Sequence, residues 1–258
     1  MEIYKLVLII IAGFIAGFVN TLAGSGSLVT LPVLIFTGLP VTIANGTNRV
    51  AILLQNIVSS TSFRKGNALD IKGAIWLGIP AAIGSVLGAQ IAIELNEDIM
   101  KKTIGVIMII MLFIMILRPQ KWQSGSLIQL ENRPTALQFL VFFFIGIYGG
   151  FIQAGVGIFL LAGLVLNIGY DLVRANAVKT GIILIFTIFA LAVFIKNDQV
   201  NWSIGVILAI GNMLGAWIGA KTAVQKGAIW VHRLVIIVIA ISAMELLGII
   251  DFIVSIFA

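Results

Sequence analysis

Long apolar runs separated by short polar loops follow one another along nearly the whole chain. Most of these runs are close to the ~20 residues that a helix needs to cross the hydrocarbon core of a bilayer. Two of them, Leu28–Leu39 and Val156–Ile168, are shorter, and we expect half-helices, re-entrant pieces or partners in a broken helix there. The runs are Leu6–Leu22, Leu28–Leu39, Ile43–Phe63, Ala74–Ile93, Thr103–Leu117, Leu137–Ile152, Val156–Ile168, Ala175–Ile195, Ile204–Ala220 and Leu234–Phe257.

The pattern is duplicated, because the second half follows the first at an offset of about 131 residues. Gly24 and Gly26 align with Gly155 and Gly157, which places the two short runs at matching positions. Apolar composition alone would not readily place Gly, Asn and Lys in one ungapped register. Further matches are Gly38 with Gly169, Asn45 with Asn176, Lys65 with Lys196 and, after a slightly shorter loop, Gly84 and Gly88 with Gly211 and Gly215.

The duplication predicts an all-α polytopic membrane protein made of two repeats of about five hydrophobic segments each, with a short broken helix in each repeat. The first repeat covers residues 1–117, a polar linker covers 118–135 and the second repeat covers 136–258. Five crossings are an odd number, so the second repeat is expected to be inverted relative to the first. The first run has the length of a spanning helix rather than of a signal-peptide core, and we expect it to belong to the mature chain.

Basic residues separate into two unequal groups if all the runs cross. A bias of this kind is what the positive-inside rule expects of a cytoplasmic face, whereas the charges divide almost evenly if the short runs only dip in and return. The bias therefore favours the inverted arrangement with both termini outside. The larger group is Arg64, Lys65, Lys72, Arg118, Lys121, Arg133, Arg174, Lys221, Lys226 and Arg233, and the smaller group is Lys5, Lys101, Lys102 and Lys196.

Composition excludes a water-soluble protein and makes several chemistries unavailable. Of the 258 residues, 60% are hydrophobic and 10% are charged, against about 25% charged in soluble domains. Cysteine is absent and His232 is the one histidine, so we expect no disulfide, no metal centre, no cofactor and no enzyme. The net charge of +6 is expected to set orientation in the lipid bilayer rather than to bind nucleic acid.

The glycine-rich breaks before the two short runs are candidate binding sites. Irregular backbone survives at membrane depth only inside protein or along a polar cavity, and a helix that begins there directs its positive dipole end at the break. The alternative is that small residues let helices approach closely, which is our preferred interpretation for Gly84, Gly88, Gly211 and Gly215. The candidate residues at the breaks are Asn20, Thr21, Gly24, Ser25, Gly26 and Ser27, and Gln153, Gly155 and Gly157.

Arg49 and Lys179 occupy nearly the same place in the two repeats, inside apolar runs. A basic residue at a helix centre costs about 2.5–3.5 kcal/mol on insertion scales, so it usually has a partner or a function. We expect the two cations to face a small anionic substrate, although snorkelling to the interface is the alternative. Neutral donors nearby are Asn45, Thr47, Asn48 and Asn176.

Glu245 is an acid inside the last run. A carboxylic acid at that depth is a candidate for proton coupling, and the alternative is that it reaches the interface or pairs with a base.

The stretch from Gly17 to Ala51, "GFVNTLAGSGSLVTLPVLIFTGLPVTIANGTNRVA", resembles the first-repeat signature of the sulfite exporter TauE/SafE family of membrane permeases. The resemblance implies transport of small sulfur-containing anions, such as sulfite or organosulfonates, across the bacterial inner membrane. The second repeat departs from the pattern at Gly163 and at Ala177-Val178. The matching elements are Gly24-Ser25-Gly26-Ser27, Pro32, Gly38-Leu39-Pro40 and Ala44-Asn45-Gly46-Thr47.

Together these features predict a secondary transporter for a small oxyanion, with its site between the two breaks and alternating access by rocking of one half against the other. A passive anion channel of the same architecture and a membrane scaffold protein are the alternatives. The pattern leaves open whether the chain forms a homo-oligomer.

Overall fold

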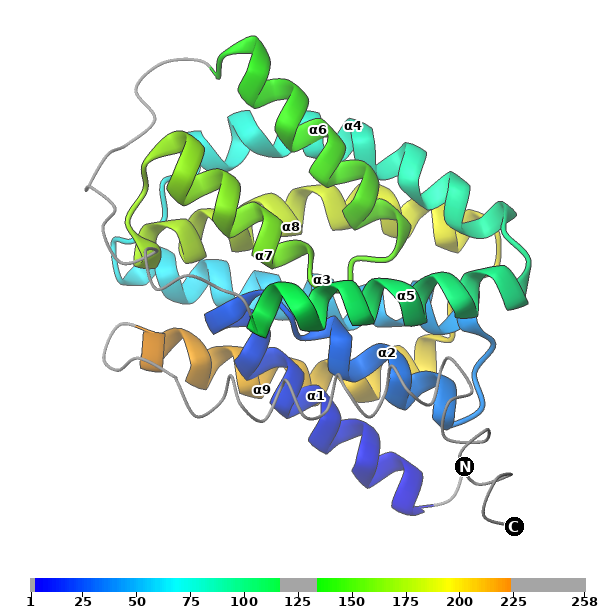
Figure 1. Cartoon of the computed structure of the whole chain (residues 1–258). Helices are drawn as coiled ribbons and strands as arrows, with labels where there is room; N and C mark the ends of the chain where they lie inside the picture. The colour runs from blue at the N-terminus through cyan, green and yellow to red at the C-terminus, as the bar shows by residue number, and fades with distance from the viewer. Residues whose placement is uncertain (1–2, 117–133, 224–258) are drawn as a thin grey trace.

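The computed structural model describes residues 3–116 and 134–223, and these ranges are mainly α-helical (Figure 1). The predicted run Leu234–Phe257 and Glu245 lie outside the described residues. The helices are α1 Ile3–Ala23, α2 Ser27–Phe36, α3 Val41–Lys65, α4 Ile71–Glu94, α5 Glu97–Ile116, α6 Ala136–Phe151, α7 Val156–Ala162 with a π-helical continuation Gly163–Ile168, α8 Leu172–Lys196 and α9 Trp202–Ala223.

The two short runs are half-helices that turn back along the helix before them. In the first half, Val29 of α2 packs against Ala12 and Ala16 of α1, and a Cβ on Gly26 would lie 2.3 Å from the carbonyl oxygen of Ala16. In the second half, Gly163 lies against Phe142 of α6. From the breaks, α2 and α7 run in opposite directions in Figure 1. The prediction of short broken helices is confirmed, with each break inside the protein.

Glycines bring α4 against α6 and α1 against α9. A Cβ on Gly84 or Gly88 would lie 2.1 Å or 1.9 Å from a carbonyl oxygen of α6. A Cβ on Gly211 or Gly215 would lie 2.1 Å or 2.0 Å from a carbonyl oxygen of α1. The predicted close helix contacts are therefore confirmed, and residue numbers rise together along both pairs, so each pair is parallel.

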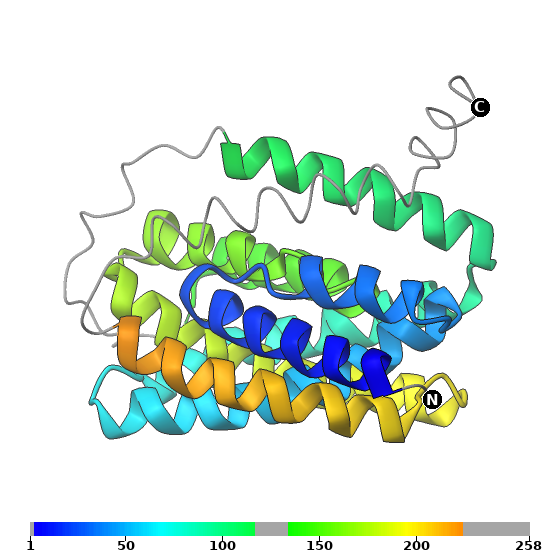
Figure 2. The ribbon, with the colours of Figure 1, turned by 90° about the horizontal axis from the view of Figure 1, so that it is seen from below.

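Helices α3 and α8 form the centre and run antiparallel. Gly46 lies against Phe194 near one end, and Ser60 donates a hydrogen bond to Thr180 at 3.0 Å near the other. Helix α3 also packs on α9 and α8 packs on α4. Helix α5 lies along one edge, with α9 along the opposite edge (Figure 2), and its methionines join the buried cluster around both breaks.

The backbone repeats at the offset found in the sequence. Three pairs of residues have matching left-handed conformations: φ is 73° at Gly24 and 72° at Gly155, 101° at Gly38 and 95° at Gly169, and 54° at Asn67 and 55° at Asp198. Each pair closes the same turn in its half, because glycine and asparagine tolerate positive φ better than other residues.

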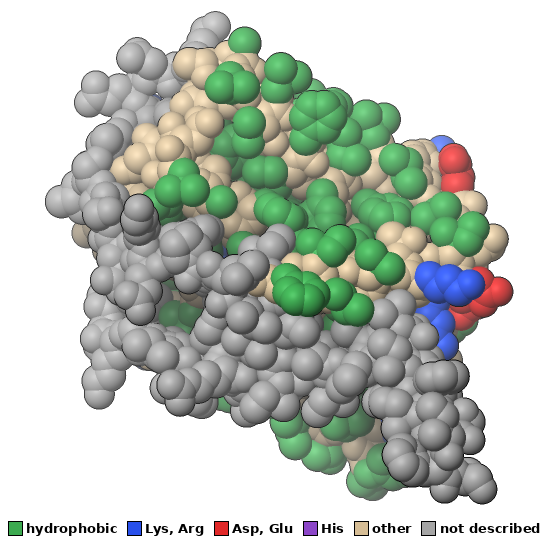
Figure 3. Space-filling view, in the orientation of Figure 1, with side chains coloured by type: hydrophobic (Ala, Val, Ile, Leu, Met, Phe, Trp, Pro, Cys, Tyr) green, Lys and Arg blue, Asp and Glu red, His purple; other side chains and the backbone are tan. Residues whose placement is uncertain are grey.

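The surface suits a lipid environment. Four of the described helical spans are long and apolar enough to cross a membrane: Ile3–Leu22, Ile71–Glu94, Leu172–Lys196 and Trp202–Thr222. On the described part of the face seen in Figure 3, hydrophobic side chains are widespread and charged side chains gather at one edge. The helix directions place basic residues in the predicted groups, with Arg64, Lys65, Lys72, Arg174 and Lys221 at one end and Lys5, Lys101, Lys102 and Lys196 at the other.

Replacing Gly88 by valine is expected to destabilise the protein by about 1–3 kcal/mol, the usual cost of overpacking, because a Cβ there would overlap the carbonyl oxygen of Ile147. Thermal unfolding in detergent measures the change. Gly66→Ala is the control, since the nearest atom to its new Cβ is 3.6 Å away. Equal melting temperatures for the two variants would contradict the close approach of α4 and α6.

Candidate functional site

The two glycine breaks touch each other in the interior. The amide of Gly157 donates a hydrogen bond to the carbonyl oxygen of Gly24 at 3.1 Å. A Cβ on Gly24 would lie 2.5 Å from backbone atoms of Gly157, and a Cβ on Gly157 would lie 2.3 Å from the Cα of Gly24. Only glycine fits at these two positions, because any side chain would separate the backbones of the two halves where they meet.

Arg49 of α3 binds the end of α6, just before the second break. Its Nη1 donates to the carbonyl oxygen of Gly149 at 3.1 Å and to Oε1 of Gln153 at 3.3 Å. Its Nη2 donates to the carbonyl oxygens of Gly150 at 2.5 Å and Phe151 at 3.4 Å. The last carbonyls of a helix lack intrahelical partners and carry the negative end of its dipole, so a buried guanidinium satisfies both requirements.

Asparagine and phenylalanine side chains hold Arg49 in place. Asn45 lies one turn before it, donates from Nδ2 to the carbonyl oxygen of Phe151 at 2.7 Å, and accepts from Arg49 Nη2 at 3.4 Å. The ring of Phe194 from α8 lies 4.6 Å from the guanidinium carbon, at a distance typical of a cation–π contact.

Lys179 of α8 binds the end of α1, just before the first break, as Arg49 binds the end of α6. Its Nζ donates to the carbonyl oxygens of Asn20 at 2.9 Å and Thr21 at 3.3 Å, and to Oδ1 of Asn176 at 2.7 Å. Asn176 itself donates to the carbonyl oxygen of Leu172 at 3.0 Å. Each half therefore supplies an asparagine and a cation, and each cation caps the broken helix of the other half.

A stripe of polar side chains on α3 faces the first break. Asn48 accepts from Thr30 of α2 at 2.7 Å, Gln55 accepts from Asn20 of α1 at 3.1 Å, and the hydroxyls of Ser59 and Thr21 lie 3.4 Å apart. The spacing of seven and four residues along α3 puts these side chains on one face.

Several buried donors beside the breaks have no hydrogen-bond partner among the described residues. They are Nδ2 of Asn48, Nε of Arg49, Nε2 of Gln55 and the hydroxyl of Ser25, whereas Oδ1 of Asn56 is the unpartnered acceptor on the same helix. An unpartnered buried donor costs about 1–3 kcal/mol. The unpartnered donors beside the breaks could bind acceptor oxygens of a ligand.

Most of the predicted site residues come together at the crossing of the two breaks. Arg49 and Lys179 are fully buried, so the snorkelling alternative is wrong for both. Gly155 has its αL backbone against Met111 of α5. The group comprises Asn20, Thr21, Gly24, Ser25, Asn45, Asn48, Arg49, Gln153, Gly155, Gly157, Asn176 and Lys179, with Gly26 and Ser27 at the start of α2.

Among the predicted residues that the structure describes, Thr47 stands apart from this group. Thr47 lies away from the breaks, because its hydroxyl accepts from the amide of Asn201 at 2.9 Å, just before α9 begins. Glu245 lies outside the described ranges. Within residues 3–116 and 134–223, no group of three or more His, Asp and Glu side chains is placed to hold a metal ion.

Sequence reasoning missed Thr30, Ser59 and Thr187, whose hydroxyls complete the network. Thr187 accepts from Nε2 of Gln153 at 2.9 Å. The polar spacing along α3 could have revealed Ser59, since it continues the face of Asn48 and Gln55. Thr30 and Thr187 are isolated hydroxyls in apolar helices, and no local pattern distinguishes them.

Comparison with known proteins points to one family. The sequence profile described as Sulfite exporter TauE/SafE matches residues 9–246. A "Probable membrane transporter protein ORF9" of Sinorhizobium sp is 28% identical over 96% of this chain and 94% of its own length. A "Probable membrane transporter protein" of Haemophilus influenzae is 27% identical over 90% of each chain. The "Probable membrane transporter protein YfcA" of Escherichia coli is 24% identical over 90% of this chain and 86% of its own length.

Replacing Lys179 by methionine is expected to lower the free energy of unfolding by at least about 2 kcal/mol, since hydrogen bonds to charged groups contribute about 1.5–3 kcal/mol each and the carbonyls of Asn20 and Thr21 each lose a charged donor. Thermal unfolding in a fixed detergent measures this loss. Lys196→Met, at the exposed end of the same helix, is the control. A loss no larger than that of the control would show that Lys179 does not hold the end of α1.

Proposed function

The chain belongs to the sulfite exporter TauE/SafE family, and from this premise we propose that it is a secondary transporter that carries a small oxyanion across the bacterial inner membrane by alternating access. The family is one of membrane transporters and not of enzymes. The observation that carries the proposal is the reciprocal arrangement of Arg49 and Lys179, two buried cations at the meeting point of two broken helices.

The chemistry around the breaks supports an oxyanion as substrate. Nε of Arg49, the amide nitrogens of Asn48 and Gln55, and the hydroxyl of Ser25 are donors without partners in the described part of the chain. Helix α2 begins at Ser27, with its positive dipole end at the same break. Sulfite or an organosulfonate presents three oxygens to such donors, and a planar guanidinium suits two of them at once.

The described conformation corresponds to a closed state in this proposal. The Nη atoms of Arg49 and the Nζ of Lys179 donate hydrogen bonds to backbone carbonyl oxygens. When the breaks separate, substrate oxygens replace some of these carbonyls, so the donors exchange one set of acceptors for another. Because the exchange involves groups of similar chemistry, opening does not leave a bare charge inside the membrane.

The helix pairing supports two inverted repeats, residues 1–117 and 136–258, joined by a linker at 118–135. Helices α1, α3 and α9 share one direction. Gly13 and Gly17 of α1 lie against Leu208 and Asn212 of α9, and α3 lies beside α9 with Thr47 against Gly205 near one end and Phe63 in one buried cluster with Ala220 near the other. Helices α4, α6 and α8 share the opposite direction. In the two repeats α1 corresponds to α6, and α4 corresponds to α9. The equivalent helices α1 and α6 then run antiparallel, and the parallel pair α1–α9 has the parallel pair α6–α4 as its counterpart.

Rocking of one repeat against the other accounts for access from each side. The excess of basic residues at the Arg64 end supports a cytoplasmic assignment for that end and outside positions for both termini. Proton coupling through Glu245 is part of the proposal and is tested by imposing a pH gradient. A passive channel would instead give high unitary currents, and a scaffold protein would show no flux.

Substitution of Arg49 by glutamine is expected to reduce sulfite flux into proteoliposomes at least about tenfold, because a hydrogen-bonded charge contributes about 1.5–3 kcal/mol. Flux of sulfite, thiosulfate, sulfonates and carboxylates is measured with and without a pH gradient. Lys196→Gln removes a charge of the same sign from an exposed position and is expected to transport as wild type. If no anion moves, or if Arg49→Gln moves it at the wild-type rate, the proposed site is wrong.

A disulfide between the halves is expected to stop transport. The side-chain oxygens of Ser60 and Thr180 are 3.0 Å apart and belong to different halves, and the natural chain has no cysteine. Oxidation of the Ser60→Cys/Thr180→Cys double variant should abolish flux, and a reductant should restore it. The two single variants control for the substitutions themselves. Full flux with the disulfide formed would exclude rocking at the α3–α8 contact.

A further inference from the structure

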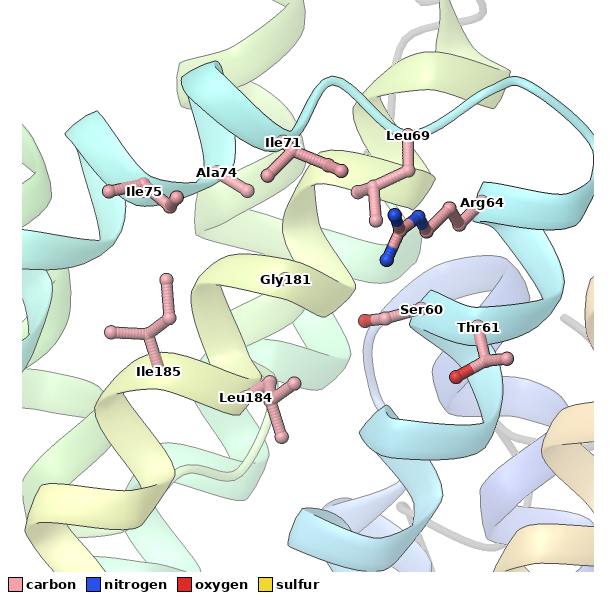
Figure 4. Close-up of a pocket in the computed structure, with 10 residues that line it drawn as sticks. All are labelled: Ser60, Thr61, Arg64, Leu69, Ile71, Ala74, Ile75, Gly181, Leu184 and Ile185. Atoms are coloured by element: carbon pink, nitrogen blue, oxygen red, sulfur yellow. The ribbon is translucent and has the colours of Figure 1, made fainter.

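A hollow of about 240 Å³ lies between the end of α3, the start of α4 and the middle of α8 (Figure 4). Its walls are mainly apolar and include Leu69, Leu184 and Ile185. Its polar groups are the guanidinium of Arg64 and the hydroxyls of Ser60 and Thr61. The combination of one cation with an apolar wall differs from the polar crossing of the two breaks.

The hollow opens on the lipid-facing flank. Two of the isoleucines that line it have large exposed fractions: Ile71 of α4 is 43% exposed and Ile75 is 48% exposed. Arg64 lies in the last turn of α3, at the end of the molecule where basic residues are in excess. This depth corresponds to the head groups of one leaflet.

Arg64 is available to a ligand. Its side chain lies among the groups that line the hollow in Figure 4, and no hydrogen bond or ion pair joins it to another residue of the described ranges. The hydroxyls of Ser60 and Thr61 already donate to Thr180 and Ile57. The hollow therefore offers donors from a guanidinium and acceptors from two hydroxyl oxygens.

The equivalent place in the second half lacks this chemistry. At the offset of 131 residues, Ser60, Thr61 and Arg64 become Leu191, Ala192 and Ile195. The first half therefore has two hydroxyls and a guanidinium at these positions, whereas the second half has three apolar side chains. A requirement of the fold itself would be expected in both halves, whereas recognition of one leaflet would be expected in one.

We propose that this hollow binds an anionic phospholipid of the leaflet at the basic end. The phosphate accepts from the guanidinium of Arg64, the glycerol hydroxyls of the head group donate to Ser60 and Thr61, and the first part of an acyl chain lies along Leu69, Leu184 and Ile185. Basic pockets between membrane helices are suited to such head groups. A free oxyanion would gain nothing from the apolar wall, and the assignment is independent of the proposed transport activity.

Photo-crosslinking with full-length protein in phosphatidylcholine nanodiscs tests the assignment. The probe is phosphatidylglycerol with a diazirine in its acyl chain, and the matched probe is phosphatidylcholine with the same chain. The anionic probe is expected to label peptides 69–75 and 181–185 about fivefold more than the zwitterionic probe, since one basic residue near an anionic lipid contributes about 1 kcal/mol. Arg64→Gln should remove the preference, Arg64→Lys should keep part of it, and Lys196→Gln should leave it intact.

Equal labelling by the two probes, or a preference that survives Arg64→Gln, would overturn the proposal. Glycerophosphoglycerol, the head group without chains, is expected to leave the labelling unchanged when added at constant ionic strength. Displacement by this soluble head group would instead identify a site for soluble anions. The melting temperature of Arg64→Gln in phosphatidylcholine is expected to equal that of the wild type. This equality would show that the variant loses lipid binding and not its fold.

Discussion

Carbonyl groups at the ends of two helices that stop inside the membrane need hydrogen-bond donors, and the rest of this structure depends on how that need is met. In hydrocarbon no water is available, and each unpaired backbone group costs several kcal/mol. Helices α1 and α6 both end inside the protein, and Lys179 and Arg49 supply the donors. Each cation is stabilised by the dipole that it caps, so a buried charge and an interrupted helix, each unfavourable alone, stabilise one another.

The caps are reciprocal, and this joins the two halves into one unit. Arg49 belongs to the first half and holds the second break, while Lys179 belongs to the second half and holds the first. Gly24 and Gly157 then come into backbone contact because neither carries a side chain. Neither half can form its break with all carbonyls paired unless the other half is present, so the hairpins α1–α2 and α6–α7 are expected to become stable only when the repeats associate.

The sequence revealed those features that depend on local backbone or on periodic patterns. Gly24 and Gly38 recur as Gly155 and Gly169 because each closes a turn with positive φ, and Gly88 recurs as Gly215 because a carbonyl of the neighbouring helix leaves no room for a Cβ. What could not be read was the partner of each cation. Arg49 and Lys179 stand out as buried charges in any hydropathy analysis, but their partners are backbone carbonyls 100 or more residues away, and carbonyls carry no sequence signal.

Thr47 shows that polar residues adjacent in the sequence need not lie together in the structure. It sits between Asn45 and Asn48, which both face the breaks, but successive residues of a helix point about 100° apart. Thr47 therefore points toward the start of α9 and caps the amide of Asn201. A polar cluster in sequence is a cluster in space only where its members share the spacing of one helix face.

The two halves use the same plan with different chemistry, and the difference bears on recognition. Arginine donates to four acceptors at the second break and to Asn45, whereas lysine donates to two carbonyl oxygens at the first break and to Asn176. The unpartnered donors of Asn48, Gln55 and Ser25 all lie in the first half, around the break that lysine caps. A lysine ammonium is a point charge that can turn toward a new acceptor with little rearrangement, whereas an arginine fork is fixed by several planar contacts. In the proposed mechanism, the ammonium of Lys179 is therefore the donor better suited to leave the carbonyls of the first break for the oxygens of a substrate. The guanidinium of Arg49 keeps more of its contacts with the second break.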